Sequence, residues 1–306
     1  VIGSTLGAIA GRQQPGVYTN GTGVQGIFQT SNAANPYKDW NMIYVPYCTG
    51  DVFYGKKPDG TVAAEASQTP PQQFVGGTDM ELFMGHIVPT YKGKVDRVII
   101  TGASAGGFGA ALNASMIMDA FGDTRVDVFD DSGPPFDDQY MPGCMQKRWS
   151  DQWGFQFPPD CTECQQADGG GLVHLADYLM RKHKQGNVAI VSSMNDEVIR
   201  LFYSVGLGDC VNYDIGDPVC VTLGQVIPCN PAQPLFPADQ YAAGLTALRA
   251  KYASTGRLST YFLGGANITK HQHEFRARFY DATAGTETIA AFAQNFLDGK
   301  MEQIGP

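Results

Sequence analysis

The sequence predicts an α/β fold in which a mostly parallel sheet is flanked by helices. β-branched apolar runs alternate with segments of helical length and period along most of the 306 residues. The clearest unit is a buried strand over Val95–Thr101, a tight turn that carries Ser104, and a helix over about Gly107–Phe121. Because this strand-helix alternation repeats, right-handed crossovers between parallel strands are the expected connections.

The other predicted elements keep the same alternating order and are separated by turn-forming residues. We expect strands over 41–48, 125–131, 187–192 and 258–263, helices over 78–91, 171–184, 238–254 and 286–297, and a helix that begins near 197. A single domain over residues 1–306 fits this order better than two domains. Two insertions, at about 133–168 and 207–236, interrupt the alternation and contain six of the seven cysteines.

The cysteines predict disulfide-stapled insertions in an exported protein, either secreted or periplasmic. Three cysteines fall in each insertion, and Cys48 is the isolated residue of the odd total. A zinc site at Cys161-x-x-Cys164 would need a second ligand pair nearby, and the sequence has none. We therefore expect no metal.

Charge and hydropathy argue against two further classes of protein. A net charge of −9 with 21 lysines and arginines is unsuited to nucleic acid. No run of about 18 apolar residues is present, so we expect no membrane span. The stretch Gly21–Gly26 matches the dinucleotide pattern G-x-G-x-x-G, but no apolar strand precedes it. We therefore expect no nucleotide cofactor.

The turn after the central strand has the pattern of a nucleophile elbow, Gly102-x-Ser104-x-Gly106. Glycines two residues either side of the serine allow the strand and the helix to approach each other. The start of the helix directs backbone N–H groups toward an oxyanion, and the N–H of Ala105 is the expected first donor. We interpret Ser104 as the nucleophile of an acyl-transfer reaction.

A serine nucleophile needs a base and an acid, which follow it in the order acid, then histidine, in hydrolases with this elbow. Of the five histidines, His271 and His273 lie after the last clear strand. Alternate residues of an extended segment point in opposite directions, so only one of these two would face Ser104. We favour His273 as the base, and we expect an ester as the substrate.

Candidate acids follow two of the predicted strands. Asp196 ends one strand and opens a helix, where it could equally be an N-cap. Asp130 and Asp131 are the alternatives after the strand next to the elbow. We favour Asp196, because both its order in the chain and its position in a loop match the pattern.

Three further residues are candidates for substrate binding. Asp51 follows the strand at 41–48, and ligands of open α/β sheets bind beyond the carboxyl ends of strands. An Asx-turn is the alternative role for this aspartate. Trp149 and Trp153 lie in the first insertion, which is too aromatic for a disordered linker. We expect them to line a substrate wall, and a purely structural cap is the alternative.

Several blocks together resemble the pectin acetylesterase/Notum carboxylesterases. They are Trp-Asn-Met-Ile-Tyr-Val-Pro-Tyr-Cys-Thr-Gly-Asp-Val at 40–52, Gly-Ala-Ser-Ala-Gly-Gly at 102–107, Asp-Asp-Ser-Gly at 130–133, Asn-Asp-Glu at 195–197 and His-Glu at 273–274. The similarity runs from about residue 26 to the C-terminus and looks closest to bacterial members. It implies an exported, α/β-hydrolase-like esterase without a metal, whose nucleophile, acid and base match Ser104, Asp196 and His273.

The resemblance has one departure. The family carries a Gly-Gly-Gly oxyanion loop followed by a cysteine upstream of the Tyr-Cys block, and this sequence has none. We expect either that the sequence begins just after that segment or that the second oxyanion donor comes from elsewhere. The implied function is a serine carboxylesterase that cleaves small acyl (acetyl) esters from a polysaccharide such as pectin through an acyl-enzyme. Alternatives are lipid acyl or polyester substrates, and a non-catalytic carbohydrate-binding protein on a hydrolase scaffold.

Overall fold

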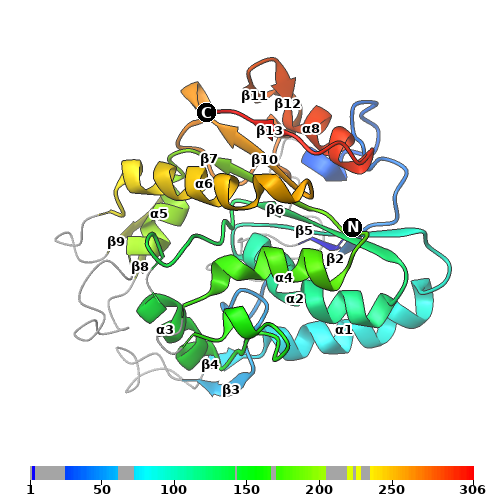
Figure 1. The fold of residues 1–306 in the computed structure, drawn as a ribbon, viewed down its shortest axis with the longest axis vertical. Coiled ribbons are helices and arrows are strands. Elements are labelled where there is room, and N and C mark those ends of the chain that lie inside the picture. The colour runs from blue at the N-terminus through cyan, green and yellow to red at the C-terminus, as the bar shows by residue number, and fades with distance from the viewer. Residues whose placement is uncertain are drawn as a thin grey trace.

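A computed structural model describes most of the chain, and its centre is a seven-stranded sheet (Figure 1). The described residues are 2–3, 25–60, 72–141, 143–166, 170–204, 219–222, 225–228 and 235–306. The strand order is β13-β10-β7-β6-β5-β1-β2, and every neighbouring pair is parallel. The strands are β1 (Ile2–Gly3), β2 (Ile43–Tyr44), β5 (Arg97–Ala103), β6 (Arg125–Asp131), β7 (Val188–Ser193), β10 (Leu258–Leu263) and β13 (Gln303–Ile304).

Helices cover both faces of this sheet. They are α1 (Gly76–Tyr91), α2 (Ala105–Phe121), α3 (Gly143–Trp153), α4 (Leu175–Lys182), α5 (Glu197–Ser204), α6 (Ala238–Tyr252), α7 (Arg278–Asp281) and α8 (Ile289–Leu297). Figure 1 places α1, α2 and α4 on one side of the sheet and α8 on the other. Strand β5 supplies both cores: Ile100 packs with the helices α1, α2 and α4, and Ile99 with α7 and α8. A parallel strand buried on both faces explains why its sequence reads as a continuous apolar run.

The predicted fold class and the order of the main elements are confirmed, while several boundaries differ. The elbow helix begins at Ala105 rather than near 107, because the glycines after it lie inside the first helical turn. The strand expected over 41–48 is limited to Ile43–Tyr44, and Pro46 cannot donate to a strand ladder. Short elements were missed: β13, and the hairpins β3 (Lys57–Gly60) with β4 (Gln72–Phe74) and β11 (Thr283–Ala284) with β12 (Glu287–Thr288).

The two insertions are described to different extents. The first contains α3 and a disulfide between Cys161 and Cys164, so one bridge is present where stapling was predicted. The second contains the hairpin β8 (Val219–Thr222) and β9 (Gln225–Pro228), and Cys210 and Cys229 lie outside the described residues. Among the cysteines whose side chains are described, Cys48 is free and exposed. Within the described ranges, no helix combines the length and apolarity needed to cross a bilayer.

Candidate active site

The turn between β5 and α2 holds Ser104 in a strained conformation. Its φ is 62°, a value that non-glycine residues rarely adopt. A Cβ atom at Gly102 would lie 2.2 Å from the carbonyl oxygen of Gly106, and one at Gly107 would lie 2.1 Å from Asp130 Oδ1. Glycine is therefore required at both positions for the strand, the helix and the neighbouring turn to pack. This is the geometry that a nucleophile elbow needs.

The hydroxyl of Ser104 is buried and has no hydrogen-bond partner among the described residues. Its backbone N–H donates to the carbonyl oxygen of Asp131, over 2.7 Å, which joins the elbow to the end of β6. Helix α2 begins at the next residue, Ala105. The first N–H groups of a helix lack partners within it, so the N–H of Ala105 is placed to donate to a charge that forms beside Ser104.

Asp196 lies after β7 and binds two different groups with its two carboxylate oxygens. Oδ1 accepts the N–H groups of Val198 and Ile199, each over 3.0 Å, and so caps α5. Oδ2 lies 2.8 Å from Nδ1 of His271. The two roles considered for this aspartate, helix cap and partner of an imidazole, are therefore combined in one side chain.

His271, rather than His273, is the histidine on Asp196. With Nδ1 directed at the carboxylate, the hydrogen bond assigns the proton to Nδ1 and leaves the Nε2 lone pair available. Nε2 is buried and has no hydrogen-bond partner within the described chain. An imidazole held by a carboxylate at one nitrogen, with an acceptor at the other, is the form that a general base requires.

The prediction that His273 pairs with Asp196 is corrected, because the ring of His273 lies against Ser193. The side chain is fully buried, and Nε2 lies 3.3 Å from the hydroxyl of Ser193. Burial lowers the pKa of His273 from its usual 6.5 to about 3, so this ring is neutral and a poor base. The expected pairing of Asp196 with His273 is therefore wrong. The physical reason lies in Gln272, whose φ of 59° turns the chain, so the segment is not extended.

Two contacts hold the loop that carries His271 against the ends of β5 and β6. The carboxylate of Asp131 accepts the backbone N–H groups of His273 and Glu274. The buried side chain of Glu274 accepts a hydrogen bond from the hydroxyl of Thr101 on β5. Because Asp131 also binds the N–H of Ser104, the elbow and the histidine loop share one anchor.

The rival acids Asp130 and Asp131 do not contact a histidine ring through any hydrogen bond of the described residues. Asp130 is buried under the first turn of α2, where burial and the charge of Asp131 raise its pKa well above the usual range. Asp131 binds backbone N–H groups instead. Sequence reasoning identified both residues but had no signal for this backbone-binding role.

The carboxylate of Asp51 is fully buried and serves the loop rather than a binding surface. Oδ1 accepts the N–H of Phe53 over 3.2 Å, and Oδ2 accepts the N–H of Gly76 over 2.7 Å, at the start of α1. A Cβ atom at Gly76 would lie 2.4 Å from this carboxylate, which explains the glycine. The structure therefore favours the Asx-turn alternative over substrate binding for Asp51.

Trp149 and Trp153 are half-buried and belong to a row of aromatic rings on α3 and its neighbours. Their ring centroids lie 5.3 Å apart in a stacked arrangement. Trp149 also packs edge-on against Phe108, over 5.5 Å. Because Phe108 lies one helical turn after Ser104, the row begins close to the elbow.

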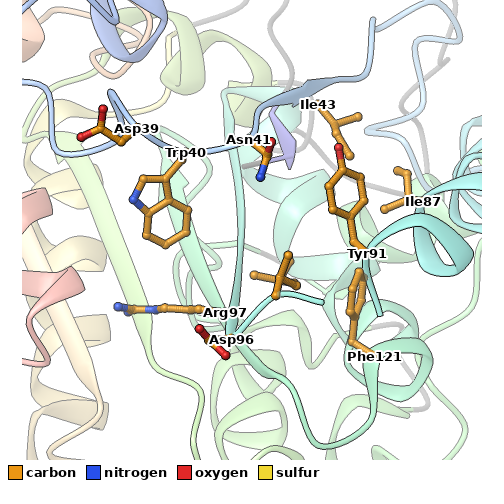
Figure 2. A pocket seen from close by; sticks show the side chains of 11 residues that line it. Asp39, Trp40, Asn41, Ile43, Ile87, Tyr91, Asp96, Arg97 and Phe121 are labelled. Atoms are coloured by element: carbon orange, nitrogen blue, oxygen red, sulfur yellow. The ribbon is translucent and has the colours of Figure 1, made fainter. Parts of the chain in front are cut away.

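A separate cavity of about 320 Å³ lies at the other end of β5 (Figure 2). Its lining includes the rings of Trp40, Tyr91 and Phe121 and the side chain of Arg97, the residue at which β5 begins. Ser104 follows the last residue of the same strand. The cavity is therefore not part of the candidate active site. No group of three or more potential metal ligands is found within the described residues.

Comparison with known proteins gives a family match. The model of the pectinacetylesterase family matches residues 17–185, more than half of the chain. Two relatives are the palmitoleoyl-protein carboxylesterases notum1 of Xenopus laevis, 28% identical over 97 residues, and NOTUM of Schmidtea mediterranea, 30% identical over 90 residues. These alignments cover 31% and 29% of this chain but 18% and 16% of those proteins, so the chain matches less than a fifth of either relative.

A solved structure of the Wnt deacylase Notum from Drosophila has the same fold. The TM-score is 0.62 at 17% sequence identity, and the superposition covers 92% of this chain and 76% of that one. A second crystal form of the same protein gives a TM-score of 0.55. The family match ends before Asp196 and His271, so the assignment of these two residues depends on the geometry described above.

Proposed function

Because the chain belongs to the pectinacetylesterase family, we propose that it is a serine carboxylesterase with Ser104, His271 and Asp196 as its catalytic residues. The observation that carries the proposal is the Asp196–His271 hydrogen bond of 2.8 Å, which leaves Nε2 of the imidazole without a partner in the described chain. The strained elbow, with Ser104 at a φ of 62°, supports the same reading.

The reaction that these groups support has two acyl-transfer steps. Ser104 Oγ attacks the ester carbonyl while its proton passes to His271 Nε2, and the Asp196 carboxylate stabilises the imidazolium. The N–H of Ala105 donates to the oxyanion. The imidazolium then protonates the leaving alcohol as the tetrahedral intermediate collapses to an acyl-serine. Water attacks this ester, again with His271 as base, and the carboxylic acid leaves.

The family description favours acetyl groups on a polysaccharide such as pectin as the substrate. The half-buried aromatic row fits this substrate and also a second candidate, an ester of a longer lipid acyl chain, because stacked rings bind the faces of sugars and also line pockets for acyl chains. The names of the relatives, palmitoleoyl-protein carboxylesterases, point to the same alternative. Trp149 and Trp153 are the residues that we propose at this wall.

The test of the reaction is hydrolysis of p-nitrophenyl acetate by the wild-type chain and by Ser104→Ala. We expect the variant to lose activity by about 10⁴-fold or more, since the nucleophile is removed. Ser115→Ala is the matched control, because this buried serine lies on the same helix and binds Tyr178 instead. Equal hydrolysis by wild type and Ser104→Ala would overturn the assignment of Ser104 as the nucleophile. No hydrolysis by wild type would overturn the esterase proposal and leave a carbohydrate-binding protein as the remaining reading.

The test of the substrate compares acetate release from acetylated pectin with hydrolysis of p-nitrophenyl esters of 2 to 16 carbons. A preference for acetyl esters supports the polysaccharide candidate, and a rise of kcat/KM with chain length supports the lipid candidate. Trp149→Ala should change whichever preference is found.

We also propose that the protein is exported, because the Cys161–Cys164 disulfide needs an oxidising compartment to persist.

A further inference from the structure

Strained backbone is concentrated where three loops meet. Among the described non-glycine residues, five have a positive φ, and three of these are Ser104 at 62°, Ser132 at 63° and Gln272 at 59°. They follow β5, β6 and β10, respectively. Such conformations persist only where surrounding contacts hold them, and they often accompany function.

The contacts that hold these loops converge on Asp131 and Ser132, which we call the 131–132 clamp. The carboxylate oxygen Oδ2 of Asp131 accepts the N–H groups of His273, over 2.5 Å, and Glu274, over 2.7 Å. The hydroxyl of Ser132 accepts the N–H of Gln272 over 3.3 Å and donates to Asp131 Oδ1 over 2.9 Å. Three successive N–H groups thus point at one clamp, as in backbone nests that bind anions.

The same clamp reaches the nucleophile. The carbonyl oxygen of Asp131 accepts the N–H of Ser104 over 2.7 Å. One residue therefore contacts the elbow with its backbone and the histidine loop with its side chain. A shift of Asp131 would change the position of Ser104 relative to His271, and small displacements of this kind are costly in catalysis.

The charge of Asp131 is not matched by a cation. Within the described chain, no lysine or arginine forms an ion pair with it, and all three of its side-chain partners are neutral donors. Both oxygens accept hydrogen bonds, as in an ionised carboxylate. Burial raises the pKa of Asp131, and the hydrogen bonds from its neutral donors and, less strongly, the nearby ring of His271 oppose this rise. A buried negative charge near a base stabilises the cation that forms when the base accepts a proton.

We propose that Asp131 is a positioning residue for the esterase reaction, an inference that rests on the proposed function. It fixes His271 relative to Ser104 through the loop backbone. Together with Asp196, it also supplies the negative charge that offsets the imidazolium formed during attack. Asp196 touches the ring, whereas Asp131 acts through the backbone and through space. Two buried carboxylates thus serve one imidazole.

Three other charged groups of the described chain interact electrostatically with Asp131. Asp130 and Glu274 are buried acids whose pKa values are raised by burial and by the charge of Asp131. Arg278, on α7, interacts with it at longer range. None of these three groups forms a hydrogen bond with the ring of His271 in the described chain, so the effect of a change at Asp131 need not pass through them.

The first test is Asp131→Asn, which preserves the shape of the side chain and removes its charge. We expect kcat/KM for p-nitrophenyl acetate to fall by roughly 10- to 100-fold with KM nearly unchanged, part of the contribution of general base catalysis. The acid limb of the pH profile should move to lower pH. In a His271→Ala background, the same change should have less than about a twofold effect, because Asp131 acts through His271.

The matched control is Asp127→Asn, a buried carboxylate on the same strand that contacts neither loop. This variant should be less stable but keep the wild-type kcat and pH profile. A wild-type pH profile in folded Asp131→Asn, or an equal loss in the His271→Ala background, would overturn the proposal and leave the esterase assignment intact.

A second readout is independent of activity. In Ser104→Ala, the titration of the His271 ring followed by NMR should have a lower midpoint when Asp131 is also replaced by asparagine. An unchanged midpoint overturns the proposal even if the chain hydrolyses no ester. If Asp131→Asn does not fold, Ser132→Ala tests the clamp: kcat/KM should fall about 3- to 10-fold, the effect of one neutral hydrogen bond, and an unchanged value would contradict us.

Discussion

Two of the three buried aspartates of strand β6, Asp127 toward its start and Asp131 at its end, have different surroundings. Asp127 accepts hydrogen bonds from Arg97, over 2.5 Å, and from Arg125, over 2.9 Å, so two cations compensate its charge. Asp131 instead binds backbone N–H groups of the histidine loop.

This difference in partners suggests different roles: Asp127 stabilises the fold, whereas Asp131 is available to influence the reaction. When cations surround a carboxylate, they cancel most of its electrostatic effect on other groups, and its ion pairs hold neighbouring strands together. A carboxylate held by neutral N–H groups keeps its charge available to a nearby proton acceptor. The second arrangement lies at the carboxyl ends of the strands, where α/β sheets place their ligands. The following predictions compare the two ends of the sheet, beginning with the largest effect.

Asp196→Asn tests the carboxyl end, and we expect the largest loss of activity there. The asparagine oxygen can still accept from Val198 and Ile199 and so keep the cap of α5. The negative charge and the control of the His271 tautomer are lost, and in serine hydrolases this costs about 10⁴-fold in kcat. Steady-state kinetics measure this effect, and circular dichroism checks the fold. A loss of less than about tenfold in folded protein would refute the role of Asp196.

Asp127→Asn tests the amino end, where the expected effect is on stability. Removing one partner of a buried ion pair costs about 3–5 kcal/mol of the free energy of unfolding, because Arg97 and Arg125 lose their counter-charge. Urea unfolding measures this loss. The kcat of the folded variant should stay within about twofold of wild type. A large loss of kcat without a loss of stability would erase the distinction between the two ends.

His273→Gln tests the buried neutral histidine through the pH dependence of stability. The pKa of His273 is about 3 in the folded chain and near 6.5 when unfolded, so acid favours the unfolded state. The contribution of the neutral ring to the free energy of unfolding is complete above about pH 6.5, and it falls as the pH decreases toward 3. Relative to the variant, wild type should lose about 1.4 kcal/mol per pH unit between pH 6 and 4. If the free energies of unfolding of wild type and His273→Gln changed with pH in the same way, the result would contradict the burial of a neutral ring.

The sequence was sufficient for the fold class and for the turn that carries Ser104, the proposed nucleophile. The strand-turn-helix context around Ser104 and the alternating order of elements follow from local pattern, and local pattern is what a sequence displays. Asp196, the proposed acid, could be named as a candidate because its position after a strand is also visible in the sequence. Short strands such as β13 carry only two residues and too little periodicity to be recognised.

The histidine that pairs with Asp196 could not be identified from sequence, because the orientation of its ring depends on contacts between distant segments. The alternation argument for His271 and His273 assumed an extended chain, and the left-handed φ of Gln272 breaks that assumption. This φ is held by N–H groups that bind Asp131 and Ser132, about 140 positions earlier. A side chain that acts by accepting backbone N–H groups leaves no residue pattern, so the 131–132 clamp was not predictable.

The most direct test of the account is the rate at which a fluorophosphonate labels Ser104, followed by mass spectrometry of the modified peptide. We predict rapid labelling of wild type and of His273→Gln, and labelling of His271→Ala that is slower by about 10³-fold or more, because the hydroxyl loses its base. Labelling of His271→Ala at the wild-type rate, with His273→Gln unlabelled, would contradict the assignment of His271.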